Sequence, residues 1–214
     1  MLKKYSKTLI VTAVIILLPM LAGLILWNKL PEQFPLHFNA AGEVDSFGSK
    51  AFGVFGLPLI LVAIHCLCVV GSLKLEPKAE NLEGKLFSLV LWITPVLSIV
   101  MNALVYCTAL GMNMNMQIIL PLLIGLLMVI VGNWLPKCKP TRTLGIKLPW
   151  TLADEENWNR THRFAGPVWV ICGMVIMLCA LIGGTFLWVM LAAFVAMIVV
   201  PTVYSWLLFK GKIK

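Results

Sequence analysis

The sequence predicts an all-α membrane protein, a polytopic bundle of about six transmembrane helices. Of its 214 residues, 60% are apolar and only 12% are charged, whereas soluble domains are about 45–50% apolar and about 25% charged. A soluble fold of this length could not hide so much apolar side chain, because a small domain still exposes a large surface. Six apolar runs, most of them near the roughly 20 residues that cross a bilayer, predict the same fold class.

The six runs cover residues 8–27, 51–73, 86–110, 117–135, 167–182 and 185–209. The first run is too long for the apolar part of a cleavable signal peptide, and no small-residue cleavage site follows it. Only Gly183 and Gly184 separate the last two runs, which predicts a tight helical hairpin. All 17 basic and nine acidic side chains fall outside the runs, as expected because a charge at mid-membrane costs several kcal/mol.

The basic residues predict the orientation. Of the 17 Lys and Arg residues, 15 lie in the N-terminal tail, the segments 74–85 and 136–166, and the C-terminal tail, and only Lys29 and Lys50 lie on the other side. Since cytoplasmic loops carry the excess of basic residues, both termini are predicted to be cytoplasmic. The net charge of +8 therefore indicates topology and contact with anionic lipid rather than direct nucleic-acid binding.

Two parts are predicted within one compact membrane domain. Residues 1–73 form an N-terminal two-span unit with an outer loop at 28–50, and residues 74–214 form a four-span unit with a cytoplasmic loop at 136–166. Both loops are longer than turns and polar enough to have a specific function.

The outer loop predicts a short hairpin-like cap. Pro31 and Pro35 exclude a helix at its start, and residues 36–39 alternate between apolar and polar, as a strand does. A turn follows in which Gly42 supplies a positive φ. The polar segment 45–49 predicts a second turn before the next helix.

The polar residues of this outer loop have two interpretations. His37, Asn39, Glu43 and Asp45 either converge on a ligand or cation, or satisfy the backbone of the turns and face water. The second is favoured, since one His and two carboxylates lack the spacing of a known ligand set. No metal site is predicted.

The inner loop predicts a short helix over residues 152–164 at the cytoplasmic interface, closed by Pro167. Thr151 is the expected N-cap, with Asp154 three residues later as in a capping box. Glu156 and Arg160 are spaced for an i, i+4 ion pair. The helix either simply connects two spans or offers a docking surface to a cytoplasmic partner, and residue chemistry favours the connector.

Catalysis has little support in the sequence. His162 with Asp154, Glu155 or Glu156 could in principle act as acid and base. The chain has no H-E-x-x-H, G-x-S-x-G or phosphate-binding glycine motif. We therefore predict no enzyme activity and no cofactor, with a membrane enzyme as the less favoured alternative.

Polar residues inside the spans leave a second alternative. His65, Asn102 and Asn133 either hydrogen-bond between helices or line a pathway. The first role is favoured, and a small permease or transporter is the alternative function.

Both long loops resemble known bacterial sequences. The outer run L-P-E-Q-F-P-L-H-F-N-A-A-G-E-V-D-S-F-G-S-K resembles the signature of a domain of unknown function that often precedes SdpI-type proteins. The inner run L-G-I-K-L-P-W-T-L-A-D-E-E-N-W-N-R-T-H-R-F-A-G resembles the signature of the SdpI family itself. Together with the number of spans, the resemblance covers most of the chain.

The resemblance implies a multi-pass protein of the bacterial cytoplasmic membrane. The founding member of the family gives immunity to a secreted peptide toxin that collapses the proton-motive force. It also acts as a sensor, because with toxin bound it holds a small winged-helix repressor at the membrane. Carried over, the outer, toxin-sensing residues are Pro31, Pro35, His37, Asn39, Gly42, Asp45 and Gly48. The inner, partner-docking residues are Gly145, Pro149, Trp150, Thr151, Trp158, Asn159, His162 and Arg163. Many relatives occur without a toxin operon, so immunity does not follow from membership.

Overall fold

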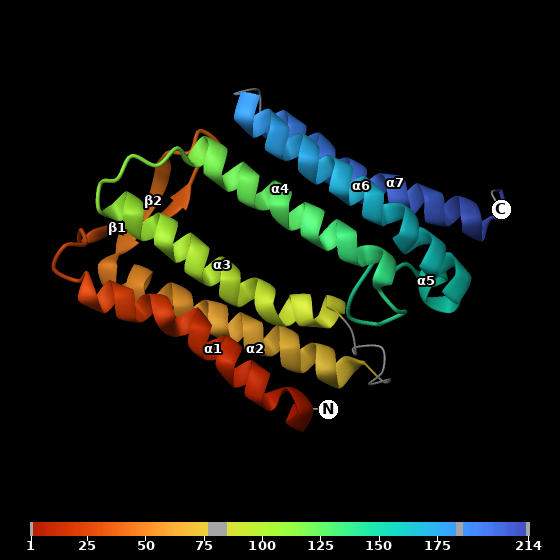
Figure 1. Ribbon diagram of the computed structural model, residues 1–214, viewed down its shortest axis with the longest axis horizontal. Coiled ribbons are helices and arrows are strands. Elements are labelled where there is room, and N and C mark those ends of the chain that lie inside the picture. The colour runs from red at the N-terminus through yellow and green to blue at the C-terminus, as the bar shows by residue number, and fades with distance from the viewer. Residues whose placement is uncertain (1, 77–84, 183–185, 213–214) are drawn as a thin grey trace. The chain divides into compact units, whose positions relative to one another are not determined.

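The computed structural model describes residues 2–76, 85–182 and 186–212. Within these residues, six helices are long and apolar enough to cross a membrane, which confirms the predicted fold class. They are α1 (Leu2–Ile25), α2 (Leu57–Leu75), α3 (Lys85–Ala109), α4 (Met116–Trp134), α6 (Glu155–Ile182) and α7 (Phe186–Phe209) (Figure 1). The turn predicted at Gly183 and Gly184 lies outside the described residues.

The helices pack as two compact units. Unit 1 comprises Met1–Lys74 and Phe87–Met116, and unit 2 comprises Leu75–Leu86 and Gln117–Lys214. By packing, α3 therefore belongs with α1 and α2. The predicted boundary at residue 73 separates two segments of sequence rather than two packing units, so it stays a prediction.

Polar side chains tie the three helices of unit 1 together. The Ser98 hydroxyl donates to the Ile16 carbonyl at 3.0 Å, and the Tyr106 hydroxyl donates to the Pro19 carbonyl at 2.9 Å, both joining α3 to α1. His65 on α2 lies 2.9 Å from the Thr12 hydroxyl on α1. These contacts match the packing role expected of His65, because polar groups in an apolar bundle need internal partners.

Glycines bring α4 and α6 of unit 2 into close contact. A Cβ added to Gly125 would lie 2.6 Å from the Gly173 carbonyl oxygen, and one added to Gly132 would lie 2.9 Å from the Gly166 carbonyl oxygen. The pairs run in opposite directions along the two helices, so α4 and α6 are antiparallel. Small residues permit such backbone approach in membranes, where dispersion and hydrogen bonds drive helix association.

A tryptophan on α6 compensates for a proline inside α7. Pro201 has no N–H, so it cannot donate to the Met197 carbonyl four residues earlier in α7. The Trp169 Nε1–H on α6 donates to that carbonyl at 3.1 Å. The helix thus keeps Pro201 without leaving a buried carbonyl unpaired.

The inner helix differs from its prediction. A short helix α5 (Pro149–Ala153) is followed by α6, which runs without interruption from Glu155 through Pro167 to Ile182. Thr151 lies inside α5, so the predicted N-cap is wrong. Asp154, with an extended backbone (φ −134°, ψ 113°), is the residue that caps α6, and its carboxylate accepts the Glu156 N–H at 3.0 Å.

Pro167 does not end the helix. Proline removes one backbone hydrogen bond, and neighbouring helices make this tolerable within a bundle. Here Gly166, beside Pro167, packs against Pro136 and the Gly132 carbonyl. This tertiary packing keeps α6 continuous at a turn where the sequence alone predicted a break.

Candidate functional site

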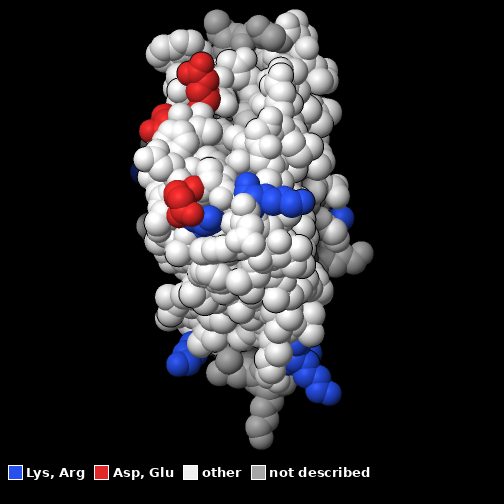
Figure 2. All heavy atoms as spheres, turned by 90° about the vertical axis from the view of Figure 1, so that its left-hand side faces the viewer, with Lys and Arg blue, Asp and Glu red and all other residues white. Residues whose placement is uncertain are grey.

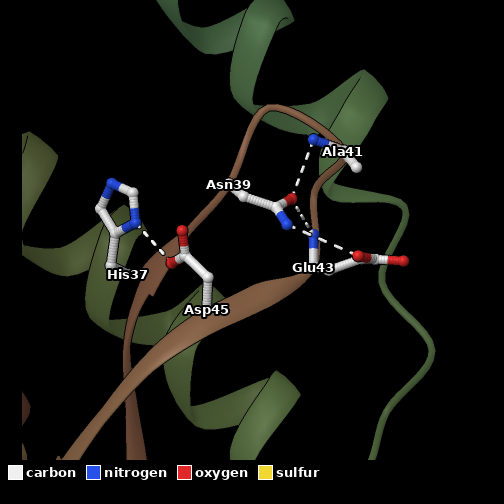
Figure 3. Close-up of polar contacts among 5 residues, drawn as sticks. All are labelled: His37, Asn39, Ala41, Glu43 and Asp45. Carbon is white, nitrogen blue, oxygen red and sulfur yellow. Dashed lines mark hydrogen bonds and ion pairs between the residues drawn. The ribbon is translucent and has the colours of Figure 1, made fainter.

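The outer loop forms an antiparallel hairpin of β1 (Gln33–Phe38) and β2 (Val44–Ser49). The turn at its tip depends on Asn39, whose Oδ1 accepts the Ala41 N–H at 2.8 Å and the Glu43 N–H at 3.0 Å (Figure 3). Gly42 has φ 73°, which confirms the predicted positive φ.

The second turn predicted at residues 45–49 is wrong, because these residues form β2. Phe47 pairs with Pro35 and Ser46 with His37, and irregularities in the register on both sides of His37 bend the ribbon. Bulges let a strand accommodate an extra residue while increasing its twist. The polar composition of 45–49 therefore reflects an exposed strand rather than a turn.

Four polar residues of the hairpin form two pairs. His37 Nδ1 lies 2.6 Å from Asp45 Oδ1, with side chains that are 67% and 41% exposed. Asn39 Nδ2 lies 3.5 Å from Glu43 Oε2 (Figure 3). Among the described residues, no group of three or more His, Cys, Asp or Glu side chains is placed to hold a metal ion.

The other face of the hairpin is buried in unit 1. Phe34 is completely buried, packs edge-on against Tyr106 with ring centroids 5.7 Å apart, and lies against the backbone of Gly53. Pro35 is also buried. Gly48 leaves room for Leu36, whose Cδ1 would lie 2.5 Å from a Cβ at that position. Pro35, Gly42 and Gly48 therefore shape the hairpin, whereas His37 and Asp45 face outward.

Lys50 fastens the base of the hairpin, a role that the sequence did not predict. Its ammonium donates to the carbonyls of Trp27 at 3.1 Å and Leu30 at 3.2 Å, and pairs with Glu32 at 2.7 Å. It also lies 4.9 Å from the centre of the Trp27 ring. The side chain is 8% exposed. Lys50, one of the two basic residues predicted on the outer side, is therefore a buried charge with a structural role.

Charged groups are sparse at the hairpin end. Figure 2 faces this end, and a few acidic and basic side chains stand out there on a mostly uncharged surface. Glu43 and Asp45 are exposed on the hairpin, whereas Glu32, although 86% exposed, is paired with Lys50.

The inner loop is built around a buried stack of Trp158 and His162 on α6. Their ring centroids are 4.1 Å apart with an interplanar angle of 22°, and both side chains are almost fully buried. The Trp158 Nε1–H donates to the Cys138 carbonyl at 2.8 Å. Gly145 has φ 99°, and a Cβ there would lie 2.6 Å from His162 Nε2.

Residues 139–148, which we call the inner strap, fold onto this stack. Thr141 holds one end, since its hydroxyl donates to the Leu144 carbonyl and accepts the Leu144 N–H, both at 2.8 Å. Thr151 holds the other end by accepting the Leu148 N–H at 2.9 Å. Cys138 is covered here, and burial raises the pKa of its thiol to about 12, so it is a poor nucleophile at neutral pH.

A buried polar network joins α5, α6 and α7. The Trp150 Nε1–H donates to Ser205 Oγ at 2.9 Å, and that hydroxyl donates to Asn157 Oδ1 at 2.7 Å. The Thr161 hydroxyl donates to the same oxygen at 3.0 Å. Sequence reasoning singled out Trp150 but missed Asn157, Thr161 and Ser205. The i, i+4 spacing of Asn157 and Thr161 was the available signal.

The predicted docking residues thus divide into two groups. Gly145, Trp150, Thr151, Trp158 and His162 make internal contacts. Pro149, Asn159 and Arg163 are exposed. The predicted ion pair between Glu156 and Arg160 is present at 3.7 Å.

The acid–base role considered for His162 loses its geometric basis. Its Nδ1 lies 2.8 Å from the Trp158 carbonyl, and its Nε2 lies 2.9 Å from the Ile146 N–H. Both nitrogens are therefore engaged by backbone groups, and neither is directed at a substrate.

Comparison with known proteins finds similarity at both long loops. Residues 137–205 match the SdpI/YfhL protein family, and residues 14–62 match the domain of unknown function DUF1648. The part of the chain that carries the inner loop is therefore similar to the SdpI family. It is 25% identical over 205 residues to Immunity protein SdpI of Bacillus subtilis (strain 168), covering 95% of this chain and 97% of that protein. No solved structure matches. With its six apolar helices and its similarity to this protein, the chain is a multi-pass protein of the bacterial cell membrane.

Proposed function

We propose that this protein gives immunity to a membrane-active peptide toxin and signals the presence of that toxin across the membrane. The observation that carries the proposal is the match to Immunity protein SdpI, which extends over 95% of this chain rather than over one motif. The proposed action is binding and signalling without catalysis.

The outer hairpin is the proposed sensing surface. His37 and Asp45 are exposed and face away from the buried side of the ribbon. Pro31 is exposed and Asn39 partly so. In this proposal Pro35, Gly42 and Gly48 act indirectly, by fixing the shape of the hairpin.

The end of unit 2 that carries α5 and the inner strap is the proposed docking surface for a small winged-helix repressor. Its contact residues are the exposed Pro149, Asn159 and Arg163. Asn159 and Arg163 are i, i+4 neighbours, so they share one face of α6. The buried Trp158, His162 and Thr151 hold that face in place, together with the partly buried Trp150 and with Gly145.

Immunity is tested by expressing the protein in a peptide-sensitive bacterium and measuring killing by a panel of membrane-active peptides. We expect protection against at least one peptide, and loss of protection in the His37→Ala, Asp45→Ala double variant. A Gln33→Ala variant, which changes another exposed hairpin residue, is the matched control. Unchanged sensitivity to every peptide on both deletion and overexpression would refute the immunity role.

Signalling needs a separate readout. A reporter placed behind the promoter of the protein's own gene measures induction by the protective peptide. We expect the Asn159→Ala, Arg163→Ala double variant to lose induction while it retains protection. Full induction in this variant would show that the exposed face of α6 is not the docking surface.

A further inference from the structure

The inner strap is fastened to α6 through one titratable side chain. The Ile146 N–H lies 2.9 Å from His162 Nε2, and a backbone amide can only donate, so Nε2 is the acceptor. His162 Nδ1, which lies 2.8 Å from the Trp158 carbonyl, must then carry the ring proton. The closed strap therefore requires a neutral imidazole with its proton on Nδ1.

The ring has no room to adjust if it gains a second proton. One face is stacked on Trp158 at a centroid distance of 4.1 Å. The strap backbone lies against the ring edge at Gly145, where even a Cβ would approach Nε2 to 2.6 Å. A proton on Nε2 would point directly at the Ile146 N–H and turn a hydrogen bond into a repulsion.

We propose that protonation of His162 releases the inner strap, so that this surface of the protein opens in acid. The sign follows from proton binding. The closed strap occupies Nε2 and binds one proton fewer than the open strap, so a falling pH favours the open form. An imidazole commonly titrates between about pH 5 and 8, and burial lowers the pKa of His162, so the opening is expected at the acid end of that range.

The surrounding charges provide little compensation for a protonated ring. Among the described residues, no ion pair includes His162. The charged and titratable groups on the strap, on the adjoining part of α6 and beside them are Lys137, Lys139, Arg142, Lys147, Asp154, Glu155, Glu156, Arg160, Arg163, Glu76 and Cys138. The strap's own charges are all basic, Glu156 pairs with Arg160, and the Glu76 carboxylate accepts the Arg142 N–H at 2.8 Å. This switch goes beyond the proposed function, because it requires neither a toxin nor a repressor.

Cys138 supplies a reporter for the opening. It is 5% exposed, and its thiol lies 3.5 Å from the Lys139 carbonyl and 4.0 Å from the Leu144 carbonyl, so the strap covers it. In full-length protein that retains only this cysteine, maleimide labelling is measured from pH 7.5 to 5.5. Each rate is divided by that of denatured protein at the same pH, which removes the titration of the thiol itself. We expect the corrected rate to rise several-fold in acid.

Two variants test the cause. In His162→Gln, the side-chain oxygen can accept the Ile146 N–H but does not titrate, so the corrected rate should stay low and independent of pH. In Gly145→Ala, the strap cannot close on the ring, so the rate should be high at every pH. A parent protein without an acid-dependent rise, an equal rise in His162→Gln, or slow labelling of Gly145→Ala would each overturn the proposal.

A second measurement covers the case in which the Gln variant fails to fold. Backbone hydrogen exchange of the parent protein, corrected for the intrinsic effect of pH, should increase in acid across residues 139–148 and remain constant across the outer hairpin. Exchange that changes equally in both segments would overturn the proposal.

Discussion

At the residue scale, several side chains supply hydrogen-bond donors to backbone carbonyls. Trp169 donates to the carbonyl that Pro201 leaves unpaired, and Tyr106 donates to the carbonyl of Pro19. Lys50 donates to two carbonyls beyond the end of α1. An unpaired buried carbonyl costs about 1–3 kcal/mol, so each donor stabilises the fold at one specific point.

The pair of Trp169 and Pro201 allows a double-mutant cycle. We expect Trp169→Phe to lower the free energy of unfolding by about 1–3 kcal/mol, because the Met197 carbonyl then loses its donor. In a Pro201→Ala background, the backbone N–H gained at this position serves that carbonyl, and the same change should cost about 1 kcal/mol or less. Unfolding in detergent measures both. Equal costs in the two backgrounds would show that the bond does not compensate for the proline.

The two outer lysines form a natural comparison. Lys50→Met should lower the unfolding free energy by about 1–3 kcal/mol, since the carbonyls of Trp27 and Leu30 lose their shared donor. Lys29 is exposed, so Lys29→Met should change it by less than about 0.5 kcal/mol. Both variants remove one positive charge, and similar losses in the two would mean that only the charge matters.

At the element scale, α4 and α6 depend on glycine for their close packing. Gly132→Ala would place a Cβ 2.9 Å from the Gly166 carbonyl oxygen and 2.8 Å from the Trp169 Cβ. Overpacking of this kind costs about 1–3 kcal/mol. A Cβ added to Gly71 in α2 would have nothing within 4 Å, so Gly71→Ala should be neutral or stabilising by up to about 1 kcal/mol. Thermal unfolding in detergent compares the two, and equal destabilisation would contradict the packing argument.

The elements also show what local sequence can predict. The turn at Gly42 was predictable, because the positive φ it needs is a local requirement that glycine meets. The continuity of α6 through Pro167 was not, since it depends on packing of Gly166 against residues about 30 positions away. Thr151 has the chemistry of an N-cap, yet Asp154 has that role because α5 and α6 meet there.

At the scale of the whole molecule, composition and hydropathy were sufficient to predict six spanning helices, since lipid imposes length and apolarity on every span. The inner site was only partly predictable. Its motif residues could be named, but burial divides them into a supporting stack around Trp158 and an exposed face with Asn159 and Arg163. Burial depends on tertiary contacts that the motif does not encode.

The central claim is that the outer hairpin and the inner strap lie on opposite sides of one membrane. In a cysteine-free background, Ala41→Cys at the tip of the hairpin and Arg142→Cys on the strap each place one thiol at an exposed position. A membrane-impermeant maleimide applied to intact cells should label the first, and should label the second only after permeabilisation. Labelling of Arg142→Cys in intact cells, or of both positions only after permeabilisation, would contradict the claim.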